Sequence, residues 1–167
     1  MEPWSIKYHP QNTEGIKGQN KAVESLKLFI DNFPKQRAAL LYGPPGCGKT
    51  SLAHAIAKER ELEIIEVNAS DVRNADSIKS KLGPAMMQMS LFGRGKIILV
   101  DEIDGVSGNS DRGGLSELGK LIAKTQFPVI MTANDPFDKK FSTLRKKSEI
   151  IAFQTLNYIS VFNVLKN

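Results

Sequence analysis

The sequence predicts an α/β fold in which a five-stranded parallel sheet is flanked by helices. Short apolar segments alternate with segments of helical spacing, one apolar segment runs into a glycine-rich motif, and another ends in paired carboxylates. Strands that alternate with helices are typical of a parallel sheet with helices on both faces. A chain of 167 residues has room for one such domain, or for one domain and a fragment of another.

The composition is that of an ordinary soluble protein, with 41% hydrophobic and 25% charged residues. No apolar run approaches the ~20 residues of a membrane span, so we expect no membrane association. The N-terminus lacks signal-peptide character, and the single cysteine excludes an internal disulfide and fits a reducing interior. A net charge of +5 permits a nucleic-acid partner but is weak support for one by itself.

The first half of the chain contains two expected strands and three expected helices. Apolar residues recur on one face of 19–33, which predicts a helix that Pro34 ends. Buried strands are expected at 38–42 and 63–67, with a helix at 51–57 between them. The next helix should run from about 75 to 89.

Two features modify that last helix. The turn residues at 68–71 can cap a helix. Gly83 and Pro84 should kink the helix or divide it, because proline removes a backbone donor and clashes with the preceding turn.

The second half continues the alternation of strands and helices. The expected elements are strands at 96–100, 128–133 and 149–153, and helices through 115–122, near 141–145, and over 155–167. In the last helix we expect Ile159, Phe162 and Leu165 to point inward, because they share one face.

The glycine-rich motif is a full match to G-x-x-x-x-G-K-[ST], a phosphate-binding loop, with a strand before it and a helix after it. A strand, a turn and a helix start in this order bring backbone N–H groups and the positive end of the helix to one point, where a polyphosphate is stabilised. The alternative, a glycine-rich turn that matches the motif by chance, is therefore disfavoured. Lys49 should reach the outer phosphates of a nucleotide, and the Thr50 hydroxyl should ligate Mg²⁺. The predicted nucleotide-binding residues of the loop are Gly43, Pro44, Pro45, Gly46, Cys47, Gly48, Lys49, Thr50 and Ser51.

Polar side chains at the ends of two later strands complete the predicted site. Ligands of parallel sheets sit at the carboxyl ends of the strands, so Asp101 should reach the Mg²⁺ shell and Glu102 should polarise an attacking water. Asn134 is expected to hold that water or the γ-phosphate. The alternatives are a merely polar strand end for the carboxylates and an ordinary turn former for Asn134. Asp104 is interpreted as a helix cap or loop solvator.

These motifs together resemble the ATPase domain of replication factor C, the sliding-clamp loader of archaea and eukaryotes within the AAA+ group. Residues 43–50 resemble the Walker A motif, 100–104 Walker B, and 132–135 sensor 1. The stretch 104–114 is similar to the large subunit in particular. The resemblance implies an AAA+ P-loop NTPase that uses ATP and Mg²⁺.

The resemblance also implies a division of the chain and an adenine pocket. Residues 1–154 would form the nucleotide-binding domain, and 155–167 would begin a helical lid that continues in a longer protein. The opening segment resembles the one that packs around adenine in the family, which assigns Tyr8, Pro10, Ile16 and Gly18 to that pocket, although His9 stands where the family commonly has Arg.

A departure from the family pattern concerns the arginine finger, which acts in trans on the ATP of a neighbouring subunit. Small subunits carry Ser-Arg-Cys where this chain has Lys146, Lys147 and Ser148. Lysine lacks the planar fork of arginine, so Lys147 should not substitute. The resemblance therefore implies that this subunit receives a finger from a neighbour and hydrolyses ATP slowly alone.

Two further sites come mainly from the resemblance. Arg73, Lys79, Lys81 and Arg112 match cations that track the phosphates of primer-template DNA, although each can equally be a solvated surface charge. Leu91 and Phe92 lie where the large subunit contacts the sliding clamp, although they can also simply pack beneath a strand.

The function implied is that of the large ATPase subunit of the clamp loader. It would grip and open the clamp with ATP bound, load it onto primer-template DNA together with the small subunits, and release it upon hydrolysis. The implied location is the archaeal cytosol, or the nucleus of a eukaryote. Two alternatives stay open: a related AAA+ DNA motor of the branch-migration type, and a nucleotide-gated binding module with negligible turnover.

Overall fold

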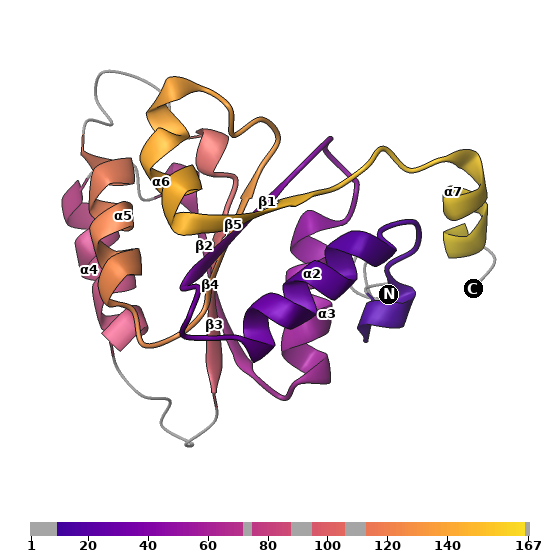
Figure 1. Cartoon of the computed structure of the whole chain (residues 1–167), viewed down its shortest axis with the longest axis horizontal. Coiled ribbons are helices and arrows are strands. Elements are labelled where there is room, and N and C mark those ends of the chain that lie inside the picture. Colours follow the sequence, from indigo (N-terminus) through magenta and orange to yellow (C-terminus); the bar gives the residue numbers. More distant parts are fainter. Residues whose placement is uncertain (1–9, 72–74, 88–94, 106–112, 166–167) are drawn as a thin grey trace, which may run out of the picture.

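The computed structural model describes residues 10–71, 75–87, 95–105 and 113–165. Strands and helices alternate along the chain (Figure 1). The strands are β1 (Ala38–Tyr42), β2 (Glu63–Asn68), β3 (Lys96–Asp101), β4 (Val129–Ala133) and β5 (Ser148–Ala152). The α-helices are α2 (Asn20–Asp31), α3 (Lys49–Glu59), α4 (Ala75–Met87), α5 (Gly114–Lys124), α6 (Ser142–Lys147) and α7 (Tyr158–Leu165). Short 3-10 turns are η1 (Thr13–Gly15), η2 (Ala69–Asp71), η3 (Ile103–Gly105) and η5 (Lys139–Phe141).

The five strands form one sheet in the order β2-β3-β4-β1-β5, and each neighbouring pair is parallel. The strand before the phosphate loop, β1, therefore lies between β4 and β5. Its last residue, Tyr42, is in register with Ala133 of β4 and Ala152 of β5. Because all strands run the same way, the loops that follow β1, β3 and β4 meet at one edge of the sheet.

Helices cover both faces of the sheet, with α4, α5 and α6 on one side and α2 and α3 on the other (Figure 1). The central strands are mostly apolar, and their apolar side chains alternate between two buried clusters. In β1, Leu40 belongs to the cluster under α4 and α5, and Leu41 to the cluster under α2 and α3. Ile98 and Leu99 divide in the same way in β3. The sequence-based prediction of the fold class is confirmed.

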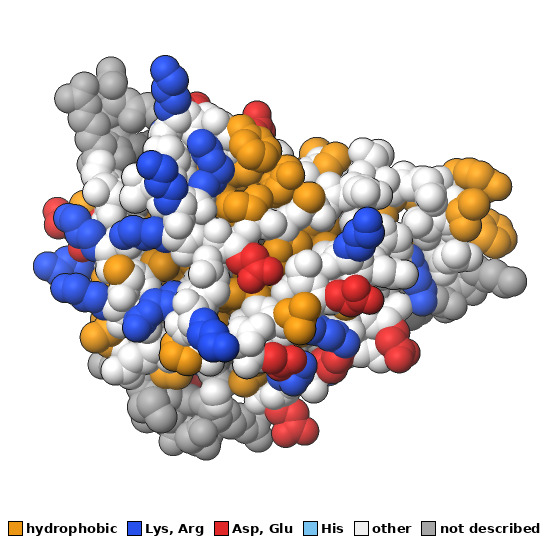
Figure 2. Space-filling model, in the orientation of Figure 1, with side chains coloured by type: hydrophobic (Ala, Val, Ile, Leu, Met, Phe, Trp, Pro, Cys, Tyr) orange, Lys and Arg blue, Asp and Glu red, His pale blue; other side chains and the backbone are white. Residues whose placement is uncertain are grey.

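Charge is distributed unevenly over the molecule (Figure 2). Lysine and arginine side chains gather over the side formed by α5 and α6, whereas acidic side chains are concentrated near α2 and α3. The cations on this side include Lys120 and Lys124 of α5 and Lys146 of α6. On the face shown in Figure 2, lysine and arginine therefore predominate over α5 and α6.

Of the two expectations for Gly83 and Pro84, division of the helix is wrong, because α4 is one continuous helix with Pro84 inside it, and a kink stays a prediction. Leu82 and Met86 on either side of Pro84 are fully buried under the sheet. Pro84 itself is exposed, so the carbonyl that loses its helical donor can be solvated. Burial of one face thus keeps the helix together across the proline.

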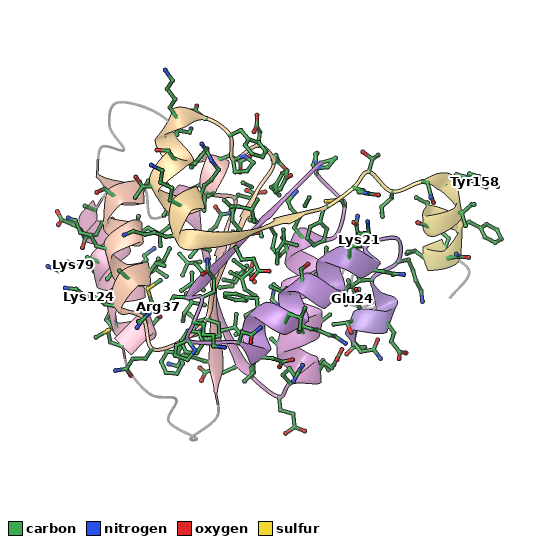
Figure 3. The ribbon with its side chains drawn as sticks, in the orientation of Figure 1. Lys21, Glu24, Arg37, Lys79, Lys124 and Tyr158 are labelled. Carbon is green, nitrogen blue, oxygen red and sulfur yellow. The ribbon has the colours of Figure 1, made fainter. Side chains whose placement is uncertain are left out.

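The expected inward orientation of the last helix is also wrong. Ile159, Phe162 and Leu165 are exposed in α7, and Ser160 is its buried residue. An extended segment after β5 carries α7 away from the sheet (Figure 1), and the Tyr158 side chain points away from the body of the molecule (Figure 3). Helical periodicity identified a common face correctly, but it could not identify what that face packs against.

Among the described residues, no helix is long and apolar enough to cross a membrane.

Candidate nucleotide site

The phosphate loop lies between the end of β1 and the start of α3. Gly46 and Gly48 have φ values of 74° and 98°, in the left-handed region that glycine adopts without strain. Gly43 is required for a second reason: a Cβ atom there would lie 2.5 Å from the Phe153 carbonyl oxygen. The loop can therefore pass close to the chain beyond β5 because it has no side chain at this point.

The Lys49 ammonium connects the start of the phosphate loop to the residue that follows β4. Its Nζ donates hydrogen bonds to the carbonyl oxygens of Gly43 at 2.7 Å and Pro44 at 2.9 Å. It also donates to the side-chain carbonyl of Asn134 at 3.1 Å. The cation is thus held at the carboxyl edge of the sheet, between β1 and β4, where an incoming polyphosphate would meet it.

A second set of contacts joins α3, β3 and β4 at Asp101. The Thr50 hydroxyl donates to Asp101 Oδ1 at 3.0 Å, and the Thr132 hydroxyl donates to the same oxygen. A hydroxyl beside a carboxylate is the hard-oxygen donor pair that Mg²⁺ prefers, and Mg²⁺ is commonly held by one or two carboxylates plus substrate phosphates. Among the described residues, no cluster of three or more His, Cys, Asp or Glu side chains could hold a metal ion.

Glu102 has a strained backbone beside this pair. Its φ is 54°, unusual for a residue with a side chain, and its N–H donates to Thr132 Oγ1 at 2.9 Å. Its exposed carboxylate lies 3.4 Å from the Asn68 amide nitrogen at the end of β2. The strained turn therefore directs the Glu102 side chain along the carboxyl edge of the sheet.

Asp104 positions the loop that carries Asn134. Its Oδ2 accepts a hydrogen bond from the Asn134 backbone N–H at 2.9 Å. Its Oδ1 is buried and has no hydrogen-bond partner among the described residues. The interpretation of Asp104 as a loop solvator is wrong, because one carboxylate oxygen is buried and the other binds the loop after β4.

These side chains surround one cavity of about 230 Å³. Its lining residues are Pro45, Gly46, Gly48, Lys49, Thr50, Ser51, Asp101, Glu102, Asp104, Thr132, Ala133 and Asn134. The cavity thus brings together the residues proposed for metal and water with most of those proposed for phosphate, whereas Gly43, Pro44 and Cys47 do not line it. The sequence assigned no individual role to Asn68 or to Thr132, although Thr132 lies in the segment that resembles sensor 1. Their position near the carboxyl ends of the two strands that flank β3 was the available signal.

Cys47 does not present its side chain to this cavity. The thiol is buried in the cluster beneath α2 and α3, where Ile16 also packs. Burial raises the pKa of the Cys47 thiol, and the nearby Lys49 opposes this effect without cancelling it. The side chain therefore packs as a small core residue, while its backbone belongs to the loop.

The expected adenine-side residues do not line the phosphate cavity. Ile16 lies beside the loop in the core, and Gly18, with a φ of 76°, packs against Ser160 of α7. Pro10 contacts Gly15. Tyr8 lies outside the described residues, so the adenine pocket stays a prediction.

The proposed DNA and clamp contacts are only partly described. Lys79 and Lys81 are exposed on α4, and Lys79 points away from the sheet (Figure 3). Arg73, Arg112, Leu91 and Phe92 lie outside the described residues. The exposure of the two lysines is compatible with a phosphate contact and equally with a solvated surface.

Lys147, which the sequence does not predict to act as a finger, makes a contact within the chain. Its Nζ donates to the Gly119 carbonyl oxygen at 2.8 Å and so ties α6 to α5.

Residues 39–156 match the model of the family described as "ATPase family associated with various cellular activities (AAA)". Because this match covers more than half of the chain, the chain belongs to the AAA ATPase family. Family membership confirms the prediction of an ATPase domain and implies nucleotide binding.

The chain is also similar to proteins named "Replication factor C large subunit". It is 46% identical over 98% of its length to that of Staphylothermus marinus, of which it covers 40%. It is 45% identical over 98% of its length to that of Nanoarchaeum equitans, of which it covers 39%. It is 43% identical over 100% of its length to that of Thermofilum pendens, of which it covers 42%. The chain therefore spans about two fifths of the length of these relatives. The suspected resemblance to the large subunit is confirmed.

Proposed function

We propose that this chain is the ATP-binding and ATP-hydrolysing domain of a clamp-loader large subunit. The observation that carries the proposal is the single cavity in which Lys49, Thr50, Asp101, Glu102 and Asn134 meet. These residues come from the loop after β1, the start of α3, and the ends of β3 and β4. They include each kind of group that phosphoryl transfer from a nucleotide requires.

The protein's part in this chemistry is mainly positioning and electrostatic stabilisation. Lys49 would move from the Gly43 and Pro44 carbonyls to the outer phosphates, while its contact with Asn134 brings that amide to the same place. Thr50 and Asp101 would hold Mg²⁺, which supplies charge neutralisation of the phosphates. Glu102 would orient and polarise the attacking water.

Hydrolysis by the isolated chain should be slow. The tether between Lys147 and Gly119 supports the idea that this subunit supplies no finger to a neighbour, and we propose that it receives one from the adjacent subunit. A cation contributed by a neighbouring subunit would then stabilise the transition-state charge. Small subunits, a sliding clamp and the phosphates of primer-template DNA are the partners we propose, because relatives carry the name of a clamp-loader subunit.

A titration of this chain with the sliding clamp of the same source, with and without ATP-Mg²⁺, tests the proposal. We expect saturable binding that is strengthened by nucleotide and lost in Phe92→Ala. Binding that survives Phe92→Ala would keep the function and move the contact elsewhere. No binding at ~100 μM, weaker than about −5.5 kcal/mol, would contradict a clamp partner.

A further inference from the structure

Gln19 is a buried polar residue that joins three segments far apart in the sequence. Its side chain is at the N-terminal end of α2, and the residue is 4% exposed. Its amide nitrogen donates to the Gln154 carbonyl at 2.7 Å and to the Cys47 carbonyl at 3.3 Å. Its amide oxygen accepts from the Gln154 N–H at 3.1 Å. Both amide hydrogens and the amide oxygen are thus used, as expected for a buried side-chain amide.

The contact with Cys47 determines how part of the phosphate loop is oriented. The C=O and N–H groups of a trans peptide point in opposite directions. With the Cys47 carbonyl bonded to Gln19, the N–H of the same peptide, which belongs to Gly48, points away from Gln19. Gly48 lines the phosphate cavity. Gln19 therefore restrains the orientation of the Cys47–Gly48 peptide, which is part of the loop that lines the phosphate cavity.

The contact with Gln154 involves the segment that leads to α7. Phe153 N–H donates to the Tyr42 carbonyl at 2.7 Å, directly before the loop begins. The missing Cβ of Gly43 lets the loop touch the Phe153 carbonyl. On the other side of Gln19 in the chain, Gly18 packs against Ser160, the buried residue of α7. The loop, the segment after β5 and the start of α7 thus form one contact region around Gln19.

We propose that Gln19 is a positioning residue that couples the phosphate loop to the placement of α7. The proposal rests on nucleotide binding by this loop, as proposed above. Ordering of the Cys47–Gly48 peptide by a bound phosphate strengthens the Gln19 contacts and so orders residues 153–157. By thermodynamic reciprocity, a partner that orders α7 raises the affinity of the loop for nucleotide.

Three variants separate this role from general stability. Gln19→Ala removes all three hydrogen bonds. Gln19→Glu keeps the shape and an acceptor for the Gln154 N–H, but it offers no donor to Cys47. Gln154→Ala is the matched control, because the exposed Gln154 contributes its backbone and not its side chain to these contacts.

The measurements are the dissociation constant for ATP-Mg²⁺ and hydrogen–deuterium exchange of residues 153–165 at nucleotide saturation. Thermal unfolding checks that each variant is folded. In the unmodified chain and in Gln154→Ala, we expect nucleotide to increase protection of this segment. In Gln19→Ala and Gln19→Glu, we expect roughly tenfold weaker binding, the effect of losing a buried hydrogen-bond donor. At saturation, Gln19→Ala should show no gain of protection there.

Each other outcome has a distinct meaning. An equal gain of protection in Gln19→Ala and the unmodified chain overturns the coupling. So does an unmodified chain that binds nucleotide and gains no protection in the segment. Failure of the folded, unmodified chain to bind nucleotide overturns the proposed function instead.

Discussion

At the scale of single residues, the walls of the cavity are connected by a few oxygen atoms that each take part in more than one hydrogen bond. Asp101 Oδ1 accepts from both Thr50 and Thr132, and Thr132 Oγ1 also accepts from the Glu102 backbone. Glu102 itself is held at a positive φ, which costs energy that the surrounding contacts must offset. The site is therefore preorganised by its neighbours and not by local preference.

Replacement of Glu102 tests whether this residue polarises the attacking water. Glu102→Gln keeps the size of the side chain but removes the charge that polarises water. We expect ATP-Mg²⁺ binding within a few-fold of the unmodified chain, and hydrolysis by the assembled loader reduced about 10²-fold or more. Turnover at the unmodified rate would exclude this role and favour a binding module that is gated by nucleotide.

Replacement of Thr132 tests whether its hydroxyl, which bonds to Asp101 and Glu102, is needed for the proposed metal site. Thr132→Val has nearly the same shape but leaves the Glu102 N–H and one Asp101 contact unmade. We expect a loss of roughly 1–3 kcal/mol of stability, the cost of unsatisfied buried groups, together with weaker Mg²⁺-dependent nucleotide binding. Thr132→Ser restores the hydroxyl and should recover binding. If both variants bind nucleotide equally, the hydroxyl has no part in the site.

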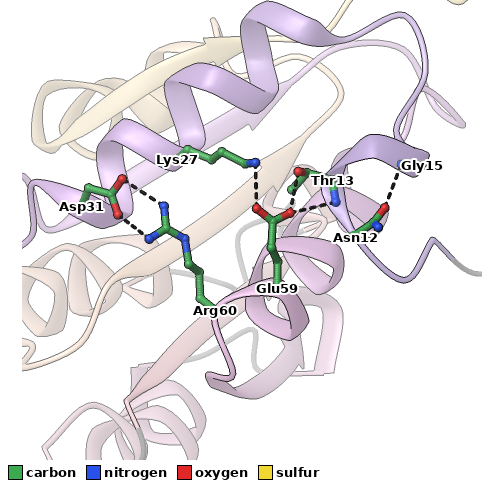
Figure 4. Close-up of polar contacts among 7 residues, drawn as sticks. All are labelled: Asn12, Thr13, Gly15, Lys27, Asp31, Glu59 and Arg60. Atoms are coloured by element: carbon green, nitrogen blue, oxygen red, sulfur yellow. Dashed lines mark hydrogen bonds and ion pairs between the residues drawn. The ribbon is translucent and has the colours of Figure 1, made fainter.

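At the scale of elements, polar contacts clamp α3 to the N-terminal segment and to α2 (Figure 4). Glu59, at the end of α3, accepts from the Thr13 N–H at 3.1 Å and the Thr13 hydroxyl at 2.5 Å, and it pairs with Lys27 at 2.7 Å. Arg60 and Asp31 form a second pair in which two nitrogens meet two oxygens at 3.0 Å. Because α3 begins at the phosphate loop, this clamp fixes the far end of the helix that carries Lys49.

The Glu59 clamp should make stability depend on acidity. The hydrogen bond from Lys27, followed by that from the Thr13 hydroxyl, lowers the pKa of Glu59 from 4.5 to about 2. As the pH falls, Glu59 is protonated in the unfolded chain before it is protonated in the folded chain. The stability that the ionised Glu59 contributes is therefore complete above pH 4.5 and is lost as the pH falls toward 2. In Glu59→Gln, unfolding free energy should fall less steeply across that window.

Urea titrations of the unfolding free energy at several pH values would measure this difference. Glu63→Gln, at an exposed position in β2, is the control and should follow the unmodified chain. An unchanged slope in Glu59→Gln would show that Glu59 makes no contribution to acid sensitivity.

At the scale of the whole molecule, the sheet and its two helical layers contain the buried apolar clusters, and α7 stands outside them. Helices α2 and α7 thus differ in how deeply their aromatic side chains are buried. Phe29 in α2 is 1% exposed, whereas Phe162 in α7 is 58% exposed.

Two matched substitutions measure this contrast. Phe29→Ala empties a buried site and should reduce the free energy of unfolding by about 3–5 kcal/mol. Phe162→Ala removes the same atoms from an exposed helix and should change it by roughly 0.5 kcal/mol or less. Denaturant unfolding of both variants provides the measurement. A comparable loss for Phe162→Ala would mean that α7 packs on the domain in solution.

The sequence by itself determined the alternation of strands and helices, the phosphate loop, and the roles proposed for Asp101, Glu102 and Asn134. These features are encoded locally, by periodicity, by glycine spacing, and by polar residues that follow apolar strands. The parallel arrangement then required the strand ends to meet, so gathering of the site could also be predicted.

The tertiary structure alone decided which distant groups meet. Gln19 and Gln154 are separated by 135 positions, and no local pattern pairs them. Three other features also depend on groups that are distant in the sequence. They are the two hydrogen bonds of the Thr132 hydroxyl, the contacts of Glu59 and the exposed face of α7. Helical spacing states which side chains share a face, but burial depends on what the rest of the chain places against that face. The continuity of α4 through Pro84 has the same cause, since packing outweighed a local preference.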